Sequence, residues 1–246
     1  MLRVLDTRKL SAIAIALVVA VLSMRPVVAA PTNPADQMPL DWPAVPNNTT
    51  ETLKAQALAD KAHAAYVAKN YELAAALFDE LLKIKPGDAR VYFNRGNSYY
   101  KLQQLDRALL DFSEALRLAP DLVVALLNRG NIYLRTEHFA EAIADYDKAI
   151  SLKAENFLVF YNRGLALGRL GKFPSAIESL NEAIRINPTD AWSYSARGDA
   201  FFAQGKPGEG RADYAKAIML DPSNTHAGQR LKELETEDHS PAGTEK

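Results

Sequence analysis

The chain has 246 residues, of which 48% are apolar and 24% are charged, a composition typical of a folded globular protein. Its 29 basic and 30 acidic residues give a net charge of -1, so it lacks the surplus of positive charge that nonspecific nucleic-acid binding requires. The chain contains no cysteine, which excludes disulfides, thiolate catalysis, iron-sulfur clusters and cysteine-based zinc sites. We therefore expect no nucleic-acid partner and no redox site.

Residues 1–30 are typical of a signal peptide. Three basic residues precede an uncharged run over residues 10–24, and the small residues of 28–30 follow it. The run is shorter than the roughly 20 residues that cross a bilayer, so we expect cleavage after Ala30, with an uncleaved N-terminal anchor as the alternative. Both alternatives place the remainder outside the cytoplasm, because positive charge before an apolar run stays inside. The lack of eukaryotic features favours a bacterial periplasmic or secreted protein, and no other membrane binding is expected.

Residues 31–50 carry five prolines in a polar setting. Proline at this density is incompatible with a helix or a paired strand, because it lacks the backbone N–H that both structures use. The segment is therefore predicted to be an extended linker.

A repeat of about 34 residues fills the region 51–234. Glycine recurs at this constant spacing and follows an arginine each time, at Gly96, Gly130, Gly164 and Gly198. Alanines and large apolar residues recur in the second half of the unit with the same spacing, as at Ala108 and Phe112 in the second unit. Proline closes four of the five units, and Ala154 replaces it in the third. Small residues at a fixed position indicate that two helices cross closely there.

This pattern resembles the tetratricopeptide repeat, whose unit is a pair of antiparallel helices. The resemblance implies an all-α, right-handed superhelical solenoid of five helix pairs, in which each pair is stabilised by its neighbours. The predicted repeats span residues 55–88, 89–122, 123–156, 157–190 and 191–224. A capping helix is expected at about 223–234, followed by a disordered tail over 235–246.

An arginine and an aspartate recur at a constant separation within the repeats. The pairs are Arg95 with Asp111, Arg129 with Asp145, and Arg197 with Asp213, while Ser179 replaces the acid in the fourth repeat. This regularity predicts an ion pair between the two helices of a repeat.

Nothing in the sequence forms a catalytic or metal site. The four histidines have no spacing of three or four residues that would place two of them on one helical face. The segment 205–208 contains Gly-Lys-Pro-Gly but lacks the upstream glycine and the Ser or Thr of a phosphate-binding loop. We predict that the protein is not an enzyme and that it has no metal and no cofactor.

Candidate binding residues lie on the first helix of each repeat, on the side that lines a concave groove in the resembled family. Asparagine occupies one position in three consecutive repeats, at Asn94, Asn128 and Asn162, and a second position at Asn97 and Asn131. A primary amide can donate to a peptide carbonyl and accept from a peptide N–H at once. The two rows predict binding of an extended peptide, with structural bonds between neighbouring repeats as the alternative.

A basic row adds to this candidate site. Lys101, Arg135 and Arg169 recur at the same position in three consecutive repeats and would favour acidic segments or a terminal carboxylate, unless they form only a solvated rim. Phe93 and Tyr161 offer aromatic contacts on the same side. One subset of the family binds the acidic C-terminus of cytosolic chaperones through asparagines and basic residues at fixed positions. Here the asparagines match, but every basic residue of that set is missing.

The predicted function is therefore that of a non-catalytic module that binds an extended peptide or a partner protein in its groove, within a cell-envelope assembly. The alternative is a structural scaffold that uses its convex face or self-associates. In that case the groove stays empty or holds residues 31–50.

Overall fold

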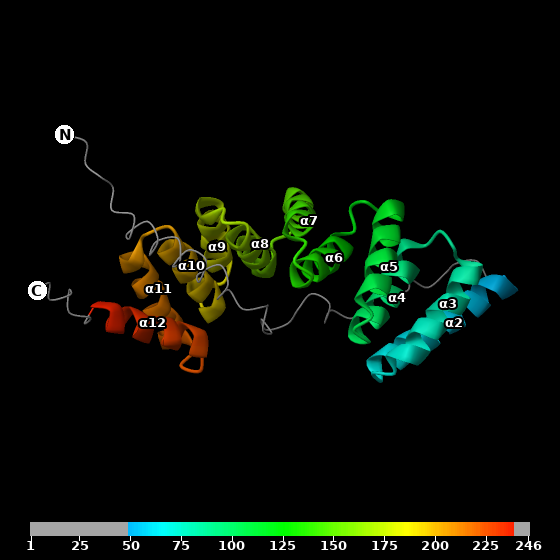
Figure 1. Ribbon diagram of the computed structural model, residues 1–246. Helices are drawn as coiled ribbons and strands as arrows, with labels where there is room; N and C mark the ends of the chain where they lie inside the picture. The colour runs from blue at the N-terminus through cyan, green and yellow to red at the C-terminus, as the bar shows by residue number, and fades with distance from the viewer. Residues whose placement is uncertain (1–48, 239–246) are drawn as a thin grey trace, which may run out of the picture. The chain divides into compact units, whose positions relative to one another are not determined.

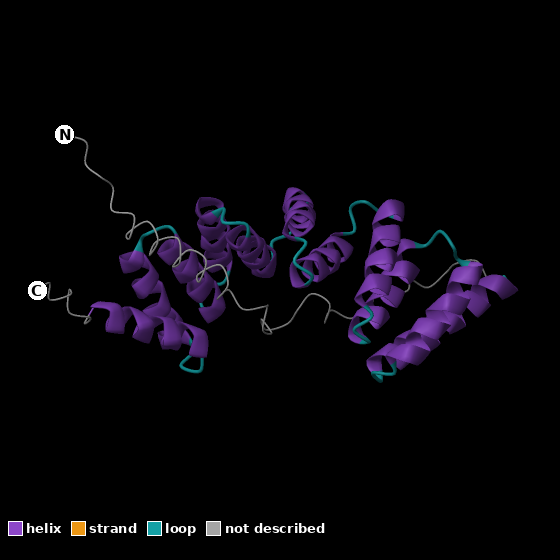
Figure 2. Cartoon of the chain, in the orientation of Figure 1, coloured by secondary structure: helices purple, strands orange, loops and turns teal. Residues whose placement is uncertain are grey.

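The computed structural model describes residues 49–238, which form eleven α-helices and no strand (Figure 1 and Figure 2). The predicted export signal, residues 31–48 of the predicted linker and most of the tail lie outside this range. The last two residues of the predicted linker lie inside it, and Thr49 caps the helix that begins at Thr50. No helix within the described range has both the length and the apolar character needed to span a membrane.

The helices follow one another as pairs that pack along their length. These pairs are α2 (Thr50–Val67) with α3 (Tyr71–Ile84), α4 (Ala89–Lys101) with α5 (Leu105–Leu118), α6 (Val123–Arg135) with α7 (Phe139–Ser151), α8 (Phe157–Arg169) with α9 (Phe173–Ile186), and α10 (Ala191–Ala203) with α11 (Pro207–Leu220). The final helix, α12 (Thr225–Asp238), packs on α11. Four first helices, α4, α6, α8 and α10, begin at the residues where the sequence places the start of a repeat.

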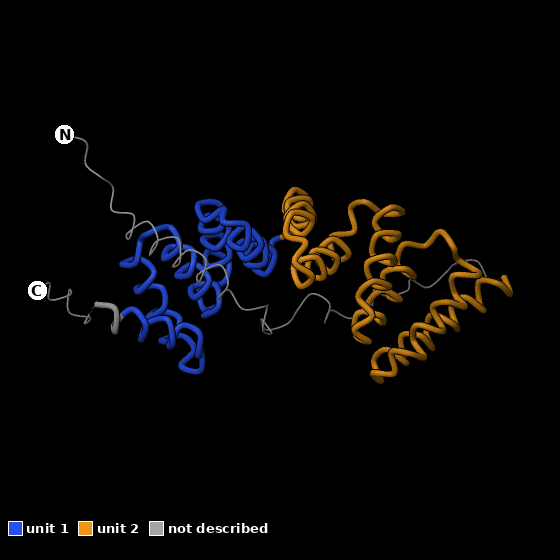
Figure 3. The backbone as a smooth tube through the Cα atoms, in the orientation of Figure 1, with its two compact units in different colours: residues 1–28, 155–246 blue, residues 29–154 orange. Residues whose placement is uncertain are grey.

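Contacts between Cα atoms divide these helices into two compact units (Figure 3). One unit contains α2 to α7, and the other contains α8 to α12. In the unit drawn orange in Figure 3, the buried alanines of α2 pack with Phe78 and Leu81 of α3. In the unit drawn blue, Tyr214 of α11 packs with Ala227 and Leu234 of α12.

The recurring glycines lie where the two helices of a pair cross. A Cβ atom added to Gly130 would lie 2.9 Å from Tyr146 Cε1, and one added to Gly164 would lie 2.7 Å from Leu180 Cγ. At Gly198 and Gly210 the backbones of the two helices lie close to each other, since a Cβ on Gly210 would lie 3.0 Å from the Gly198 carbonyl oxygen. Glycine at position 210, where other repeats have alanine, therefore avoids this tight contact.

The predicted ion pairs are confirmed in three repeats. Arg95 donates to both carboxylate oxygens of Asp111, with N···O distances of 2.8 and 2.6 Å, and the same geometry joins Arg129 to Asp145 and Arg197 to Asp213. In the fourth repeat, Arg163 Nη1 donates to Ser179 Oγ at 2.6 Å.

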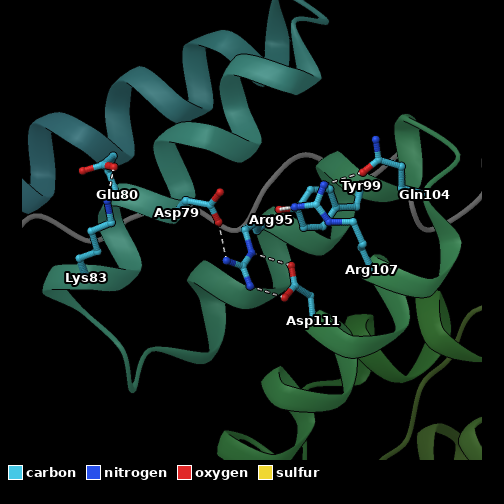
Figure 4. Close-up of polar contacts among 8 residues, drawn as sticks. All are labelled: Asp79, Glu80, Lys83, Arg95, Tyr99, Gln104, Arg107 and Asp111. Atoms are coloured by element: carbon cyan, nitrogen blue, oxygen red, sulfur yellow. Dashed lines mark hydrogen bonds and ion pairs between the residues drawn. The ribbon is translucent and has the colours of Figure 1, made fainter.

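The same arginines also reach the preceding repeat, a contact that the sequence analysis did not predict. Arg95 Nη1 lies 2.5 Å from Asp79 Oδ1 of α3, so its guanidinium bridges α3 and α5 (Figure 4). Arg129 donates to Ser113 at 3.1 Å, and Arg197 donates to Asn181 at 2.6 Å. Burial lowers the pKa of Arg95, but the hydrogen bonds to Asp111 and Asp79 outweigh this effect and keep the pKa above its ordinary value.

The turn inside each repeat contains one residue with positive φ. These residues again occupy one equivalent position per repeat: Lys69, Gln103, Glu137, Gly171 and Gly205, with φ between 59° and 79°. The following residue donates its N–H to a carbonyl five positions back, as in Asn70 N to Ala65 O at 2.9 Å, which is the bond of a Schellman helix end. Glycine occupies this position in only two repeats, so the other three place a side chain in a region that L-residues disfavour.

The turn after α7 differs from the other turns between repeats. The residue before proline has φ between -126° and -138° at Lys85, Ala119, Asn187 and Asp221. At the equivalent Lys153, φ is 60°, and Ala154 N donates to Ala149 O at 3.1 Å. Proline restricts the preceding residue to extended conformations and cannot donate a hydrogen bond. Alanine at position 154 therefore permits this turn, and the boundary between the two compact units falls directly after it.

The terminal helix α12 extends the helical region beyond the expected cap. It begins at Thr225, and the side chain of Asn224 accepts from Ala227 N at 3.0 Å and so caps its first turn. It ends at Asp238, so residues 235–238, which were predicted to belong to the disordered tail, are helical. No glycine or proline lies between Leu234 and Asp238 to stop the helix.

Candidate functional site

The unit of α2 to α7 brings four predicted asparagines together on its first helices. Asn94 and Asn97 lie on α4, and Asn128 and Asn131 lie on α6. All four are buried, with between 0% and 7% of the residue surface exposed. We call these four residues, with Lys101 and Arg135 at the ends of the same helices, the first-helix face.

Asn97 and Asn128 bond directly to each other across the boundary between two repeats. Asn128 Nδ2 donates to Asn97 Oδ1 at 2.8 Å. The remaining atoms, Asn97 Nδ2 and Asn128 Oδ1, are shielded from solvent and have no hydrogen-bond partner among the described residues. Turning both amides over would reverse the bond but would still leave one donor and one acceptor unused. The pair therefore keeps one donor and one acceptor unused, the two groups needed to bind the C=O and the N–H of one residue of an extended chain.

Asn131 forms a hydrogen bond within its own repeat. Its Oδ1 accepts from the hydroxyl of Tyr146 on α7 at 2.7 Å, and this bond fixes the tyrosine ring that packs on Gly130. An equivalent bond joins Tyr214 to Asp199 at 2.7 Å in the other unit, because Asp199 occupies the position of Asn131 two repeats later. This asparagine therefore has a structural partner within the helix pair.

The basic and aromatic candidates in this unit have different surroundings. Arg135 is exposed, and its Nη2 donates to Gln103 Oε1 at 2.9 Å. Lys101 is partly exposed at the end of α4. Phe93 is 1% exposed and packs against Phe112 with ring centroids 5.8 Å apart, so it contributes to the interior of its own repeat.

The remaining candidates, Tyr161, Asn162 and Arg169, lie on α8 and belong to the other unit. Tyr161 and Asn162 are buried, while Arg169 is partly exposed. Burial raises the pKa of the Tyr161 phenol, and the nearby carboxylates of Asp190 and Asp199 raise it further. The structure thus divides the predicted rows between two units.

A cluster around Asp199 was missed by the sequence analysis. Its Oδ2 lies 2.8 Å from His226 Nε2, its Oδ1 accepts from Tyr214, and Arg230 Nε lies 3.9 Å away. His226 and Arg230 are one turn apart on α12, so Asp199 anchors this helix to the last repeat. One signal could have indicated this role: α12 begins one full repeat period after the start of α10, as a further first helix would.

Among the described residues, no group of three or more histidine, aspartate or glutamate side chains is arranged to hold a metal ion.

Family models of the tetratricopeptide repeat match several parts of the chain. A model described as "Tetratricopeptide repeat" matches residues 89–122. One described as "TPR repeat" matches 136–171 and 167–205, and a further "Tetratricopeptide repeat" model matches 193–224. Together the matched segments span half of the chain. No curated protein sequence matches it.

Solved structures with the same fold include MamA and YrrB. MamA (41-end) from Desulfovibrio magneticus RS-1 has a TM-score of 0.66 at 18% identity, over 70% of this chain and 97% of its own. MamA AMB-1 has a TM-score of 0.63 at 25% identity, over 70% and 93%. YrrB, described as a TPR protein with an unusual peptide-binding site, has a TM-score of 0.68 at 18% identity, over 75% and 98%.

The fold prediction of an all-α helical repeat array is confirmed. The helix pairs, the repeating register of glycines and turns, and the matched family models lead to one conclusion: the chain belongs to the tetratricopeptide repeat proteins.

Proposed function

We propose that this protein is a non-catalytic binding module that holds an extended peptide segment of a partner protein on the first-helix face of α4 and α6. The observation that carries the proposal is the Asn97–Asn128 pair. Its unused donor and acceptor match the C=O and N–H of one residue of an extended chain, which point to the same side.

The energetics of burial support this assignment. A buried polar atom without a hydrogen-bond partner costs about 1–3 kcal/mol, so a partner that bonds to both atoms recovers much of this cost. Both atoms are shielded from solvent, so binding of the segment displaces the side chains that cover them. The description of YrrB, a protein with the same fold, also names a peptide-binding site.

A peptide array tests the proposal. The full chain is labelled and applied to immobilised ten-residue peptides of varied sequence, in parallel with an Asn97→Leu/Asn128→Leu double variant. Leucine has the same branched arrangement of side-chain heavy atoms as asparagine, and replacing both partners of a buried hydrogen bond by apolar groups of the same shape can be nearly neutral for stability. We expect the double variant to keep its melting temperature within a few degrees and to lose peptide binding.

Equal binding by both proteins would contradict the proposal. Leu110 of α5, 72% exposed, supplies a matched control because a Leu110→Asn change alters the opposite helix of the repeat without touching the core. Loss of binding in this control alone would favour the alternative scaffold that uses its convex face.

A structural role for the asparagines is the second candidate, and the 2.8 Å bond between Asn97 and Asn128 favours it directly. In that case the pair only aligns neighbouring repeats. The double variant then unfolds at lower urea concentration, and peptide binding changes only as far as the folded fraction changes.

We also propose that the array works outside the cytoplasm, in the cell envelope, after cleavage of residues 1–30. The basic start, the uncharged run and the small residues before Pro31 support this. Expression in a bacterial host, fractionation and N-terminal sequencing should give a periplasmic protein that begins at Pro31. A cytoplasmic protein with an intact N-terminus would contradict it, and a membrane-bound intact chain would favour the anchor.

A further inference from the structure

Arg135 is held in place by the preceding repeat. Its guanidinium donates to Gln103 Oε1 at 2.9 Å and lies over the Tyr100 ring, with Cζ 5.4 Å from the ring centroid. Gln103 belongs to the positive-φ turn that follows α4. An arginine of the third repeat thus rests on the end of the second, although its surface is exposed.

Within the described part of the chain, no carboxylate forms an ion pair with Arg135. The arginines of the repeat core differ, because Arg95, Arg129 and Arg197 each hold an aspartate through two hydrogen bonds. A guanidinium has five N–H donors, and the bond to Gln103 uses one of them. The donors that remain suit a carboxylate, which arginine binds through two parallel bonds.

Arg135 also has a defined register with the Asn97–Asn128 pair. It follows Asn128 by seven residues on α6, so the two lie on the same side of the helix, about two turns apart. Two turns correspond to roughly 10.5 Å at 1.5 Å per residue. An extended chain covers this length in about three residues.

We propose that Arg135 binds a carboxylate of the partner segment, about three residues from the residue whose C=O and N–H bond to Asn97 and Asn128. The carboxylate is that of an acidic side chain or of the partner's C-terminus. This inference rests on the proposed function, and it makes an acidic extended segment the ligand.

Peptides recovered from the array give the test. Each is synthesised with a fluorophore, and its dissociation constant is measured by anisotropy with the full-length wild type and with an Arg135→Gln variant. Every Asp or Glu of the peptide is changed in turn to Asn or Gln, and the C-terminal carboxylate is separately amidated. This separates an acidic side chain from a chain end.

We expect neutralisation of one carboxylate to weaken wild-type binding about tenfold or more, as for a lost hydrogen bond to a charged group. Arg135→Gln should bind the unmodified peptide with a similar loss and show no further loss when that carboxylate is neutralised. Arg107→Gln is the matched control. Arg107 also contacts a glutamine and a tyrosine, Gln104 and Tyr99, but it lies on the second helix of its repeat.

Two results would overturn the inference: neutralisation that weakens Arg135→Gln as much as wild type, or a wild type that is indifferent to every carboxylate. Both leave the peptide-binding function intact if the Asn97→Leu/Asn128→Leu variant still fails to bind. A wild type that binds no peptide would reject the function and this inference together.

Discussion

At the scale of single residues, position in the repeat does not determine the role of a polar side chain. Asn97, Asn131 and Asp199 occupy equivalent positions, yet Asn97 accepts from an asparagine of the next repeat, whereas the other two accept from the tyrosine of their own repeat. Asp199 in addition contacts His226 of α12. Each contact depends on a partner at another position. The recurring positions in the sequence identify residues on the same side of the first helices. The structure shows which residue each of them contacts.

Two buried tyrosines predict that stability falls at alkaline pH. Burial raises the pKa of Tyr214, which also donates to Asp199, and burial raises the pKa of Tyr161. The folded state therefore holds these protons more tightly than the unfolded state, where a tyrosine titrates near about pH 10. The stabilisation is complete below that value and is lost above it, by up to about 1.4 kcal/mol per pH unit for each group.

Urea unfolding of wild type, Tyr161→Phe and Tyr214→Phe between pH 8 and 11 checks this. Each variant should lose less unfolding free energy than wild type as the pH rises above about 10. Tyr92→Phe, at a partly exposed position, controls for the loss of a hydroxyl. Parallel curves for all four proteins would show that the buried phenols do not govern the pH dependence.

At the scale of helices, the glycine at each crossing sets how closely a pair can pack. Gly130→Ala should destabilise the protein by about 1–3 kcal/mol, because the added methyl group would lie 2.9 Å from Tyr146 Cε1. Tyr146 is fully buried and bonded to Asn131, so its ring cannot move aside. Urea unfolding followed by circular dichroism measures the change.

Gly87→Ala provides the control for this substitution. An added Cβ at Gly87 has no neighbour within 4 Å, and we expect a change within about 0.5 kcal/mol. If the Gly130→Ala and Gly87→Ala variants are equally stable, the two helices of the pair can move apart without a loss of unfolding free energy.

The backbone conformation of the turns between helices can be predicted only in part from the sequence. Gly171 and Gly205 are typical of the positive-φ position that ends a helix, but Lys69, Gln103 and Glu137 adopt the same conformation without any glycine signal. Each of them precedes a residue that donates the Schellman bond, and this helix end requires a left-handed residue. The sequence shows that Ala154 breaks the proline series, but it does not show that the φ of Lys153 becomes positive as a result.

At the scale of the whole molecule, each repeat is stabilised mainly by its neighbours, so helices at the ends should be the least protected. Hydrogen exchange followed by mass spectrometry should show faster exchange in α2 and α12 than in α5 and α10. Leu234→Asn removes a buried contact of α12 and should accelerate exchange in α12 first. Uniform exchange through α8 to α12 would instead indicate a single cooperative unit.

The sequence by itself determined the helix pairs, the crossing glycines and the ion pairs within repeats. These features recur at fixed positions in one unit, and a contact inside a repeat is repeated wherever its residues are repeated. The tertiary structure alone decided the bond between Asn97 and Asn128, the reach of Arg95 to Asp79, the support of Arg135 by Gln103, and the anchoring of α12 at Asp199. Those contacts join different repeats, and they depend on how successive helices stack, which the periodicity of the sequence does not encode.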